Sequence, residues 1–413
     1  MARPRNFDQE KFGRLDGLLP EAKGKISAPR ETLPKELDIP GLPDGAWTAR
    51  GVYRMERRFA YGRYYGKRQL APLRKSGETL SHWGGTPVSV FLDTETTGLS
   101  GGTGTYAFLI GLGLCHEDFF SVVQLFLAGP AWERAWLAAI EDELPADCGL
   151  VTYNGRAFDL PLLRTRYTLS RAVPSWNTAP HIDLLTLARH FYRERLSSCS
   201  LGSIERNVLG LNRSGEDVPG SEIPWMYTQF LRDQDAAPLR GIFYHNTLDI
   251  VSLAALQLQV AEMACGQCSC AAEMLRAGDL WAAKGFYEKA RELWRAALDF
   301  PQDRHLALLR LAETERAAGN YEAAHACYAE ALETDRRPVP TLEAMAKLEE
   351  HKLKRCEEAL AHTRAALRWL EGHRIFKDKR WQTDRENLLY REERLIKKLE
   401  KGRCETEAPD EEE

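Results

Sequence analysis

The sequence has few cysteines, and those it has do not form a disulfide framework. Nine cysteines are scattered over 413 residues, whereas a small secreted scaffold has closely spaced pairs. The first residues, MARPRNFDQEKFGRL, have no apolar core of the secretory kind, and no uninterrupted apolar run approaches the ~18 residues of a membrane span. We therefore expect a cytoplasmic protein without a membrane segment.

An overall excess of basic residues is also missing. The net charge is −4, with 56 Lys and Arg against 60 Asp and Glu, which excludes a uniformly basic coat for nucleic acid. One block departs from this balance: residues 51–85 hold eight Lys and Arg against two Asp and Glu, whereas residues 86–258 have a net charge of −7. Walker and Rossmann glycine motifs are absent as well, so the sequence supports neither an NTPase nor a dehydrogenase.

The chain exceeds the ~250–300 residues at which a single core stops growing, so we expect several domains. Residues 1–50 contain a Pro-rich run, and we interpret them as a partly disordered linker or a strap over the next domain. Residues 51–86 are a basic, aromatic N-terminal extension that packs on the following domain. Its Tyr and Arg side chains could face nucleic acid, or form an edge hairpin whose aromatics pack on the core.

From residue 87 the pattern is first strand-like and then mixed. PVSVFLDTE, TYAFLIGLGLC and FFSVVQLFLA predict three consecutive strands, and GLVTYNG predicts a fourth. Helical spacing follows in segments such as AWERAWLAAIEDEL, DLPLLRTRYTL and NTLDIVSLAALQLQVAEM, and SLGSIERNVLG also predicts a helix. Three meandering strands, then alternating helices and strands, predict an α/β domain over 87–262 with a mixed sheet flanked by helices.

After about residue 270 the pattern is helical and repeats itself. Six residues recur 34 positions later: Gly285, Tyr287, Ala290, Trp294, Ala297 and Leu298 return as Gly319, Tyr321, Ala324, Tyr328, Ala331 and Leu332. A weaker third copy follows at 359–367. The period and the small residues resemble tetratricopeptide repeats, in which helix pairs stack into a solenoid. We expect an all-α repeat domain over 271–400 and an acidic, disordered tail over 401–413.

The segment FLDTETTGL at 91–99 carries the strongest chemical signal. Residues i and i+2 of a strand point to the same side, so Asp93 and Glu95 share a face. Two adjacent carboxylates repel each other, and a divalent cation that prefers oxygen ligands, Mg²⁺ or Mn²⁺, relieves that repulsion. The pair alone is a weak pattern, but its place between an apolar strand and a glycine-rich turn strengthens it.

Two further segments offer acidic side chains. In YNGRAFDLPLL, Asp159 would lie at the start of a helix, where the alternative is an ordinary helix cap. In YHNTLDIVSLAAL, His245 and Asp249 are at positions i and i+4 of one helix and so share a face. Asp249 would ligate a metal, while the imidazole of His245 would take a proton from water. The alternative is an exposed His and a surface Asp.

The four acidic residues, in this order and in these surroundings, resemble the DEDD exonucleases related to the DnaQ proofreading subunit. The resemblance spans roughly residues 87–258 and includes HIDLLTLAR and SLGSIERNVLGL. Together with the helical repeats and with EDVPGSEIPWMYTQFL at 216–231, the chain looks more like the YprB-like ribonuclease H-like proteins of bacteria. That family implies a ribonuclease H-like fold and a metal-dependent nuclease.

What the resemblance implies for this chain is a two-metal mechanism. Two Mg²⁺ or Mn²⁺ ions would be held by four carboxylates: Asp93, Glu95, Asp159 and Asp249. The base would be His245. The residues that would contact the substrate are Thr97, Gly98, Leu99, Asn154 and Phe158. One departure affects the base, because His245 precedes Asp249 by the spacing of the family's Tyr-type branch, so that Tyr244 could face the site instead.

The predicted function is hydrolysis of phosphodiester bonds, by a 3′–5′ exonuclease that acts on single-stranded nucleic acid. Two alternatives stay open. One is a nucleic-acid-binding adaptor whose helical repeats recruit a protein partner. The other is an RNA endonuclease, because the same metal site can cut internally if its cleft is open. The sequence does not choose between DNA and RNA.

Overall fold

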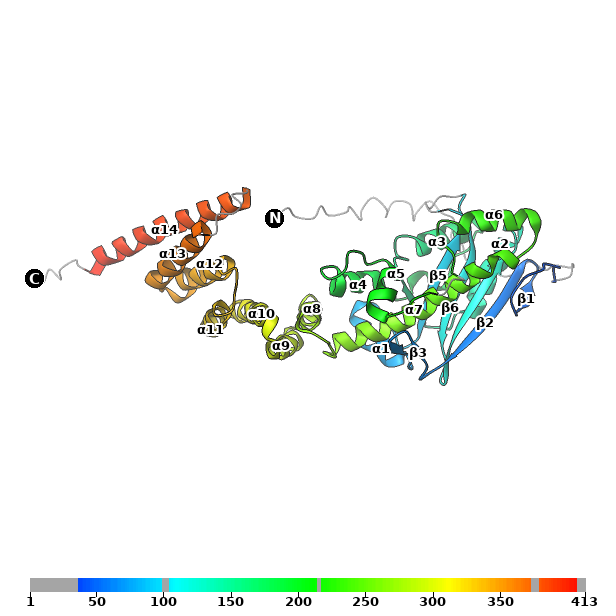
Figure 1. Ribbon diagram of the computed structural model, residues 1–413, viewed down its shortest axis with the longest axis horizontal. Coiled ribbons are helices and arrows are strands. Elements are labelled where there is room, and N and C mark those ends of the chain that lie inside the picture. The colour runs from blue at the N-terminus through cyan, green and yellow to red at the C-terminus, as the bar shows by residue number, and fades with distance from the viewer. Residues whose placement is uncertain (1–35, 99–103, 214–216, 373–378, 407–413) are drawn as a thin grey trace, which may run out of the picture. The chain divides into compact units, whose positions relative to one another are not determined.

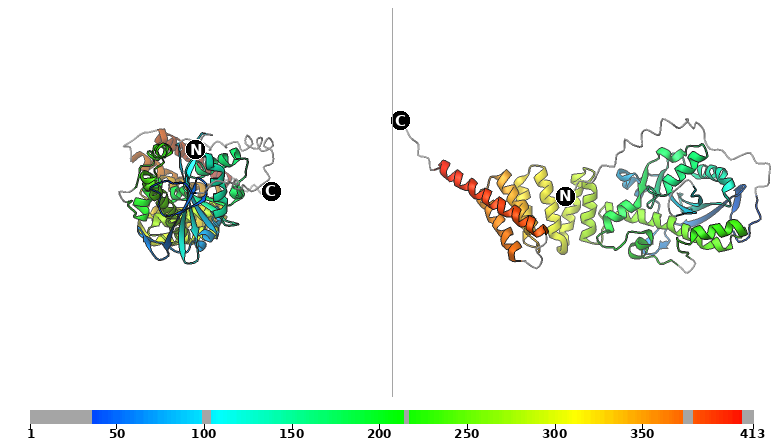
Figure 2. Two further views of the ribbon diagram at one scale, coloured as in Figure 1. Left: turned by 90° about the vertical axis from the view of Figure 1, so that its right-hand side faces the viewer. Right: turned by 90° about the horizontal axis from the view of Figure 1, so that it is seen from above.

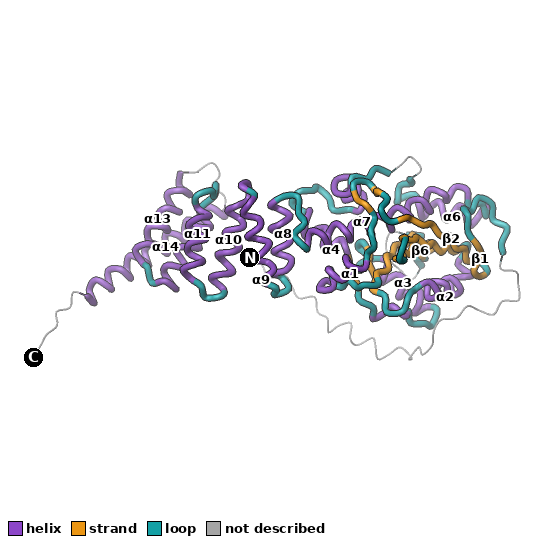
Figure 3. Tube along the Cα trace, turned by 90° about the horizontal axis from the view of Figure 1, so that it is seen from below, coloured by secondary structure: helices purple, strands orange, loops and turns teal. Residues whose placement is uncertain are grey.

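The computed structural model describes residues 36–98, 104–213, 217–372 and 379–406 (Figure 1). The chain divides into two compact units, Met1–Glu262 and Met263–Glu413. Among the described residues, strands occur in the first unit, and the second is helical (Figure 3). This arrangement confirms the predicted α/β fold followed by an all-helical region.

The strands are β1 (Ala46–Ala49), β2 (Val52–Ala60), β3 (Tyr64–Tyr65), β4 (Arg68–Gln69), β5 (Ser89–Thr96), β6 (Ala107–Cys115), β7 (Phe119–Leu127), β8 (Gly149–Thr152) and β9 (His181–Asp183). The α-helices of the first unit are α1 (Arg74–Thr79), α2 (Glu133–Glu143), α3 (Asp159–Leu169), α4 (Leu184–Tyr192), α5 (Leu201–Ile204), α6 (Ile223–Asp233) and α7 (Arg240–Ala264). Those of the second unit are α8 (Ala271–Ala282), α9 (Tyr287–Ala296), α10 (Arg304–Ala317), α11 (Tyr321–Leu332), α12 (Val339–Leu348), α13 (Cys356–Gly372) and α14 (Lys379–Thr406).

A seven-stranded sheet forms the centre of the first unit, with the order β1-β2-β7-β6-β5-β8-β9. β5, β6 and β7 are antiparallel neighbours, as the meander predicts, and β8 and β9 extend the sheet from β5 in parallel. The C-terminal ends of β5 and β8 therefore lie at the same edge of the sheet. The α-helix predicted over 200–210 is shorter than expected, because α5 gives way to a π-helix at Glu205–Leu209.

The basic segment 52–60 belongs to the same sheet. β2 pairs with β7 along its whole length, and β1 follows as the outer strand. Tyr53 and Met55 are buried, while Arg57 and Arg58 are exposed, so the hairpin alternative describes this part of the segment. β1 lies in a stretch for which the sequence predicts only linker or strap, and Trp47 packs edge-on against Tyr53 with ring centroids 5.0 Å apart.

The helix α7 crosses one face of the sheet (Figures 1 and 2), and its Asn246 contacts the Asp93 side chain of β5. Its approach depends on a glycine in β6, because a Cβ on Gly111 would lie 2.3 Å from Asn246 Oδ1. Residues 237–264 are long and apolar enough to span a membrane, but 78% of the apolar window is buried inside the protein, as in the core helix of a globular domain.

The second unit consists of helix pairs. Gly285 and Gly319 follow the first helix of two successive pairs with φ of 83° and 86°, a backbone conformation that glycine adopts without strain. The second helices bury equivalent residues, Ala290 in α9 and Ala324 in α11. The 34-residue pattern in the sequence thus corresponds to two equivalent pairs, α8 with α9 and α10 with α11, and α12 packs against α13 as the next.

Candidate metal and active site

Three elements bring the four predicted carboxylates together. Asp93 and Glu95 project from β5, Asp159 begins α3, and Asp249 lies on α7. Glu95, Asp159 and Asp249 are each at most 9% exposed. One carboxylate oxygen from Glu95, one from Asp249 and a ring nitrogen of His245 lie within 4.8 Å of one another. The site therefore combines buried acidic groups from parts of the sequence that are more than 150 residues apart.

Burial and neighbouring carboxylates raise the pKa values of Asp93 and Glu95. Burial, and then the charges of Asp249, Asp159 and Glu95, raise the pKa of Asp93 well above its ordinary value. Burial and the charges of Asp249 and Asp159 do the same to the pKa of Glu95. Keeping all four groups ionised is therefore costly without a cation. Since the donors are hard oxygen atoms, the cluster fits a divalent ion such as Mg²⁺ or Mn²⁺.

A buried amide network fixes the orientation of Asp93. Asn246 Nδ2 donates to Asp93 Oδ2 at 3.0 Å, and Asn246 Oδ1 accepts from Gln124 Nε2 at 2.9 Å. Gln124 Nε2 also donates to the carbonyl of Phe243 at 2.9 Å. Sequence reasoning did not single out Asn246 or Gln124. The sequence does contain one signal for this network. Gln124 is the amide side chain in the apolar strand FFSVVQLFLA, and a buried amide requires hydrogen-bond partners.

Asp159 does not cap its helix. Phe158 occupies the N-cap position of α3 without a side-chain cap hydrogen bond, and Asp159 Oδ1 accepts from Thr94 Oγ1 at 2.5 Å. The helix-cap alternative for Asp159 is therefore wrong, since its carboxylate is turned toward β5. Asp183, by contrast, does cap α4, and its carboxylate also accepts from the backbone N–H of Asn154 at 2.8 Å. That second contact anchors the loop between β8 and α3.

The residues predicted to contact substrate differ in their availability. Phe158 is 54% exposed at the start of α3, beside Asp159. Asn154 has a φ of 65° in the loop after β8, and its backbone N–H already donates to the carboxylate of Asp183. Leu99 lies outside the described residues. Among these three, Phe158 offers a surface on which a base could stack.

Thr97 and Gly98 are held by local hydrogen bonds at the end of β5. Thr97 N donates to the carbonyl of Tyr106 at 2.9 Å, and Thr97 Oγ1 accepts from Tyr106 N at 2.9 Å. The carbonyl of Gly98 accepts from Thr96 Oγ1 at 2.8 Å. The backbone N–H of Thr97 is therefore engaged within the protein, and a contact from this N–H to a nucleotide would require that hydrogen bond to break.

The imidazole of His245 points toward the carboxylates. Its Nε2 lies 3.5 Å from Asp249 Oδ2, and its Nδ1 lies 2.7 Å from Asp217 Oδ1. The same Nδ1 lies 3.1 Å from Arg213 Nη1, which only donates hydrogen bonds. Nδ1 therefore has an acceptor and a donor as neighbours, and Nε2 is the ring nitrogen on the side of the acidic cluster, where a general base is needed.

Arg213 is a site residue that sequence reasoning missed. Its guanidinium donates from Nε and Nη2 to the two oxygens of Glu205, at 2.8 and 2.7 Å, and from Nη2 to Asp249 Oδ1. Glu205 is buried and also accepts from Ser252 Oγ at 2.6 Å. Although burial opposes its charge, these carboxylates raise the pKa of Arg213. Arg213 thus neutralises part of the acidic cluster from the side of Asp249.

In EDTA, the protein should lose stability as the pH rises from about 4 to about 6. Burial raises the pKa of Asp159 from 3.8 to about 6, so over this interval the folded state keeps a proton that the unfolded chain releases. The cost of ionisation is absent below the unfolded pKa and complete above the folded pKa, at about 3 kcal/mol for two pKa units. Thermal unfolding across this range measures the slope, which Asp159→Asn should flatten. An unchanged slope in that variant would contradict the assignment.

The comparisons with known proteins agree with this geometry. A family model described as RNase_H superfamily matches residues 90–260. The seven-stranded mixed sheet flanked by helices is consistent with a ribonuclease H-like fold over this range. The chain is also 39% identical over 173 residues to a Bacillus subtilis (strain 168) protein named "Uncharacterized protein YprB". The aligned region covers 42% of this chain and 41% of that relative, so the chain matches about two fifths of the relative's length.

Proposed function

We propose that the first unit is a metal-dependent nuclease that hydrolyses phosphodiester bonds as a 3′–5′ exonuclease on single-stranded nucleic acid. The observation that carries this proposal is the convergence of Asp93, Glu95, Asp159 and Asp249 beside the imidazole of His245. Two Mg²⁺ or Mn²⁺ ions held by these carboxylates would supply charge neutralisation at the phosphate and a more acidic water.

The chain's own residues have separate tasks in this proposal. His245 Nε2 takes the proton of the attacking water, and Asp217 and Arg213 hold the ring in place through contacts to Nδ1 at 2.7 and 3.1 Å. Asn246 holds the carboxylate of Asp93 in one orientation. Phe158, exposed next to Asp159, stacks on the terminal base.

The hairpin of β3 and β4 supports nucleic-acid binding beside the site. It rests on α7 and on the π-helix, because Tyr65 Oη donates to the carbonyl of Leu248 at 3.4 Å and Lys67 N to that of Leu209 at 2.7 Å. Tyr64 is 69% exposed, and the side chains of Arg63 and Lys67 are also exposed. An aromatic between two basic side chains is suited to a single strand.

We expect the Arg63→Ala/Lys67→Ala double variant to bind a single-stranded oligonucleotide about tenfold more weakly at low salt. The slope of log Kd against log salt should fall by about one to two, because binding releases fewer counterions when phosphate contacts are lost. Fluorescence anisotropy over a salt series measures both. Arg68 is left in place because it pairs with Glu262 at 2.5 Å. The matched control removes two exposed arginines elsewhere, Arg134 and Arg232, and an equal loss in the control would reject the hairpin as the binding surface.

Degradation of end-labelled single-stranded DNA and RNA, with Mg²⁺, Mn²⁺ or EDTA, tests the proposed reaction. A ladder that shortens one nucleotide at a time and requires metal supports the exonuclease, and the faster substrate identifies the preferred sugar. Internal fragments with the same metal requirement support the endonuclease alternative. Binding without turnover under every condition would reject the nuclease proposal.

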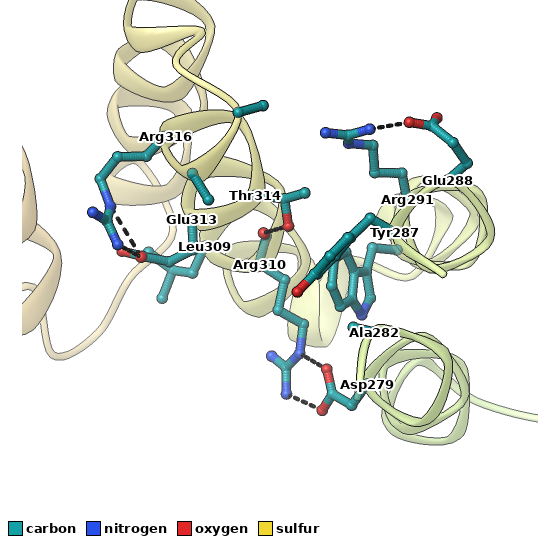
Figure 4. A pocket seen from close by; sticks show the side chains of 13 residues that line it. Asp279, Ala282, Tyr287, Glu288, Arg291, Leu309, Arg310, Glu313, Thr314 and Arg316 are labelled. Atoms are coloured by element: carbon teal, nitrogen blue, oxygen red, sulfur yellow. Dashed lines mark hydrogen bonds and ion pairs between the residues drawn. The ribbon is translucent and has the colours of Figure 1, made fainter. Parts of the chain in front are cut away.

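A second candidate function, that of an adaptor, is favoured by a pocket in the second unit. This cavity has a volume of about 960 Å³ and is lined by residues of α8, α9 and α10, with Tyr287 exposed at its wall (Figure 4). Its three arginines are paired, so the pocket is close to neutral: Arg291 with Glu288, Arg310 with Asp279 at 2.6 Å and Arg316 with Glu313 at 2.5 Å. We propose that these helix pairs are tetratricopeptide-like and recruit a protein partner through this apolar surface.

A further inference from the structure

A second cluster of metal-ligating side chains lies in the helical unit, where α11, the end of α12 and α13 meet (Figure 1). Its centre is Glu349, whose side chain is completely buried. Glu349 Oε1 lies 2.8 Å from His325 Nε2, and Oε2 lies 2.9 Å from His362 Nδ1. One ligand atom each from His325, Glu349 and Glu358 lie within 4.8 Å of one another.

The backbone at this point places two consecutive acidic residues in the interior. Residues Glu349–Leu353 form a π-helix after α12, and the carbonyl of Glu349 accepts from Arg355 N at 2.9 Å. π-helices are rare, and single π-helical turns within α-helices are frequent at functional sites. Glu350, the next residue, is buried as well, so the two carboxylates can be compared in one local environment.

The two carboxylates are neutralised in different ways. Glu350 contacts permanent cations of α14: Arg391 at 2.8 Å, Arg394 at 2.6 Å and Lys398 at 2.7 Å. Within the described residues, each oxygen of Glu349 is contacted by an imidazole instead. The cationic groups of Arg and Lys around Glu350 only donate hydrogen bonds and do not ligate a metal, whereas the imidazole nitrogens beside Glu349 belong to a metal-ligating side chain. Glu349 therefore lies among potential metal ligands, and Glu350 lies among cations.

We propose that His325, Glu349 and Glu358 form a binding site for one divalent ion of the zinc class, separate from the acidic cluster of the first unit. A neutral imidazole nitrogen and two carboxylates are a donor set that Zn²⁺ accepts, with a fourth position left for water. His362 holds the second oxygen of Glu349 and so fixes the orientation of the ligating carboxylate. The ion would join α11 to α13 and stabilise the helix pairs.

Metal titration of the full chain tests the proposal. The protein is first treated with chelator and then kept in saturating Mg²⁺, so that the hard carboxylate cluster of the first unit is occupied. Zn²⁺ binding is measured by calorimetry, and Co²⁺ is added as a spectroscopic probe whose visible absorption reports the coordination. We expect one Zn²⁺ per chain at this site, and an increase in the unfolding temperature of the helical unit.

Two ligand variants and one matched control decide the result. Glu358→Gln alters a side chain that is 52% exposed, so the variant should fold, and its affinity for Zn²⁺ should fall at least about tenfold. His325→Gln should have the same effect. His351→Gln removes an imidazole 3.5 Å from Glu350, outside the cluster, and should bind Zn²⁺ as the parent does. Equal Zn²⁺ stoichiometry, affinity and stabilisation in all four proteins would overturn the proposal and leave ordinary His–Glu ion pairs.

Discussion

The Asp93→Asn variant should lose metal-dependent hydrolysis by more than about 100-fold and yet be more stable than the parent protein in EDTA. Asp93 is the carboxylate whose pKa is raised by burial and by all three other members of the cluster, Asp249, Asp159 and Glu95. An amide of the same shape removes one negative charge from that group. Its carbonyl oxygen can still accept from Asn246 Nδ2, so the buried network is kept.

The gain in stability separates this prediction from a simple loss of fold. A gain of about 1 kcal/mol would raise the unfolding temperature of a domain of this size by about 2–4 °C. With Mn²⁺ present the order should reverse, because the parent site gains a cation that the variant binds weakly. The measurements are the nuclease assay and thermal unfolding with EDTA or Mn²⁺.

The matched control is Asp118→Asn, which removes an exposed carboxylate at the turn between β6 and β7. It should leave hydrolysis and both unfolding temperatures unchanged. If Asp93→Asn were destabilised in EDTA, mutual repulsion would not be the dominant feature of the site. If the variant kept its activity, Asp93 would have no part in metal binding.

The parts of this site that sequence reasoning reached are those with a local geometric rule. Alternation along a strand places Asp93 and Glu95 on one face, and helical periodicity places His245 with Asp249, and both placements are found in the structure. The central mixed sheet was predictable from composition along the chain, because short continuous apolar runs mark β5, β6 and β7. β1 was not, because the strand is short and lies in a Pro-rich stretch.

Arg213 could not be found this way, because its position depends on tertiary contacts. It follows the π-helix at Glu205–Leu209 in the segment LNRSGED, which has no periodicity that assigns a face. Its partners are Glu205, eight residues earlier, and Asp249, thirty-six residues later. In the basic block 51–85, a count of basic residues overestimates the phosphate-binding surface. Arg68 is paired with Glu262 and does not add to that surface.

We expect Arg213→Ala to destabilise the first unit by about 3–5 kcal/mol in EDTA, because it leaves buried carboxylates without their cation. Glu205 would lose two hydrogen bonds and Asp249 one. Mn²⁺ should restore part of this loss, since a bound divalent ion supplies positive charge at Asp249. The restoration should be incomplete, because Glu205 lies behind Arg213 against Ser252 and keeps its uncompensated charge.

Arg166→Ala is the matched control for this experiment. Arg166 also forms a buried bidentate pair, with Glu133 at 2.5 and 2.6 Å, so its loss should destabilise the unit by a similar amount in EDTA. Glu133 is not among the clustered carboxylates, so Mn²⁺ should raise the unfolding temperature of this variant no more than that of the parent. A larger metal-induced rise in Arg213→Ala than in Arg166→Ala would show that Arg213 and the metal neutralise the same carboxylate. Equal rises would mean that Arg213 only supports the fold through Glu205, and that Asp249 does not depend on it for charge balance.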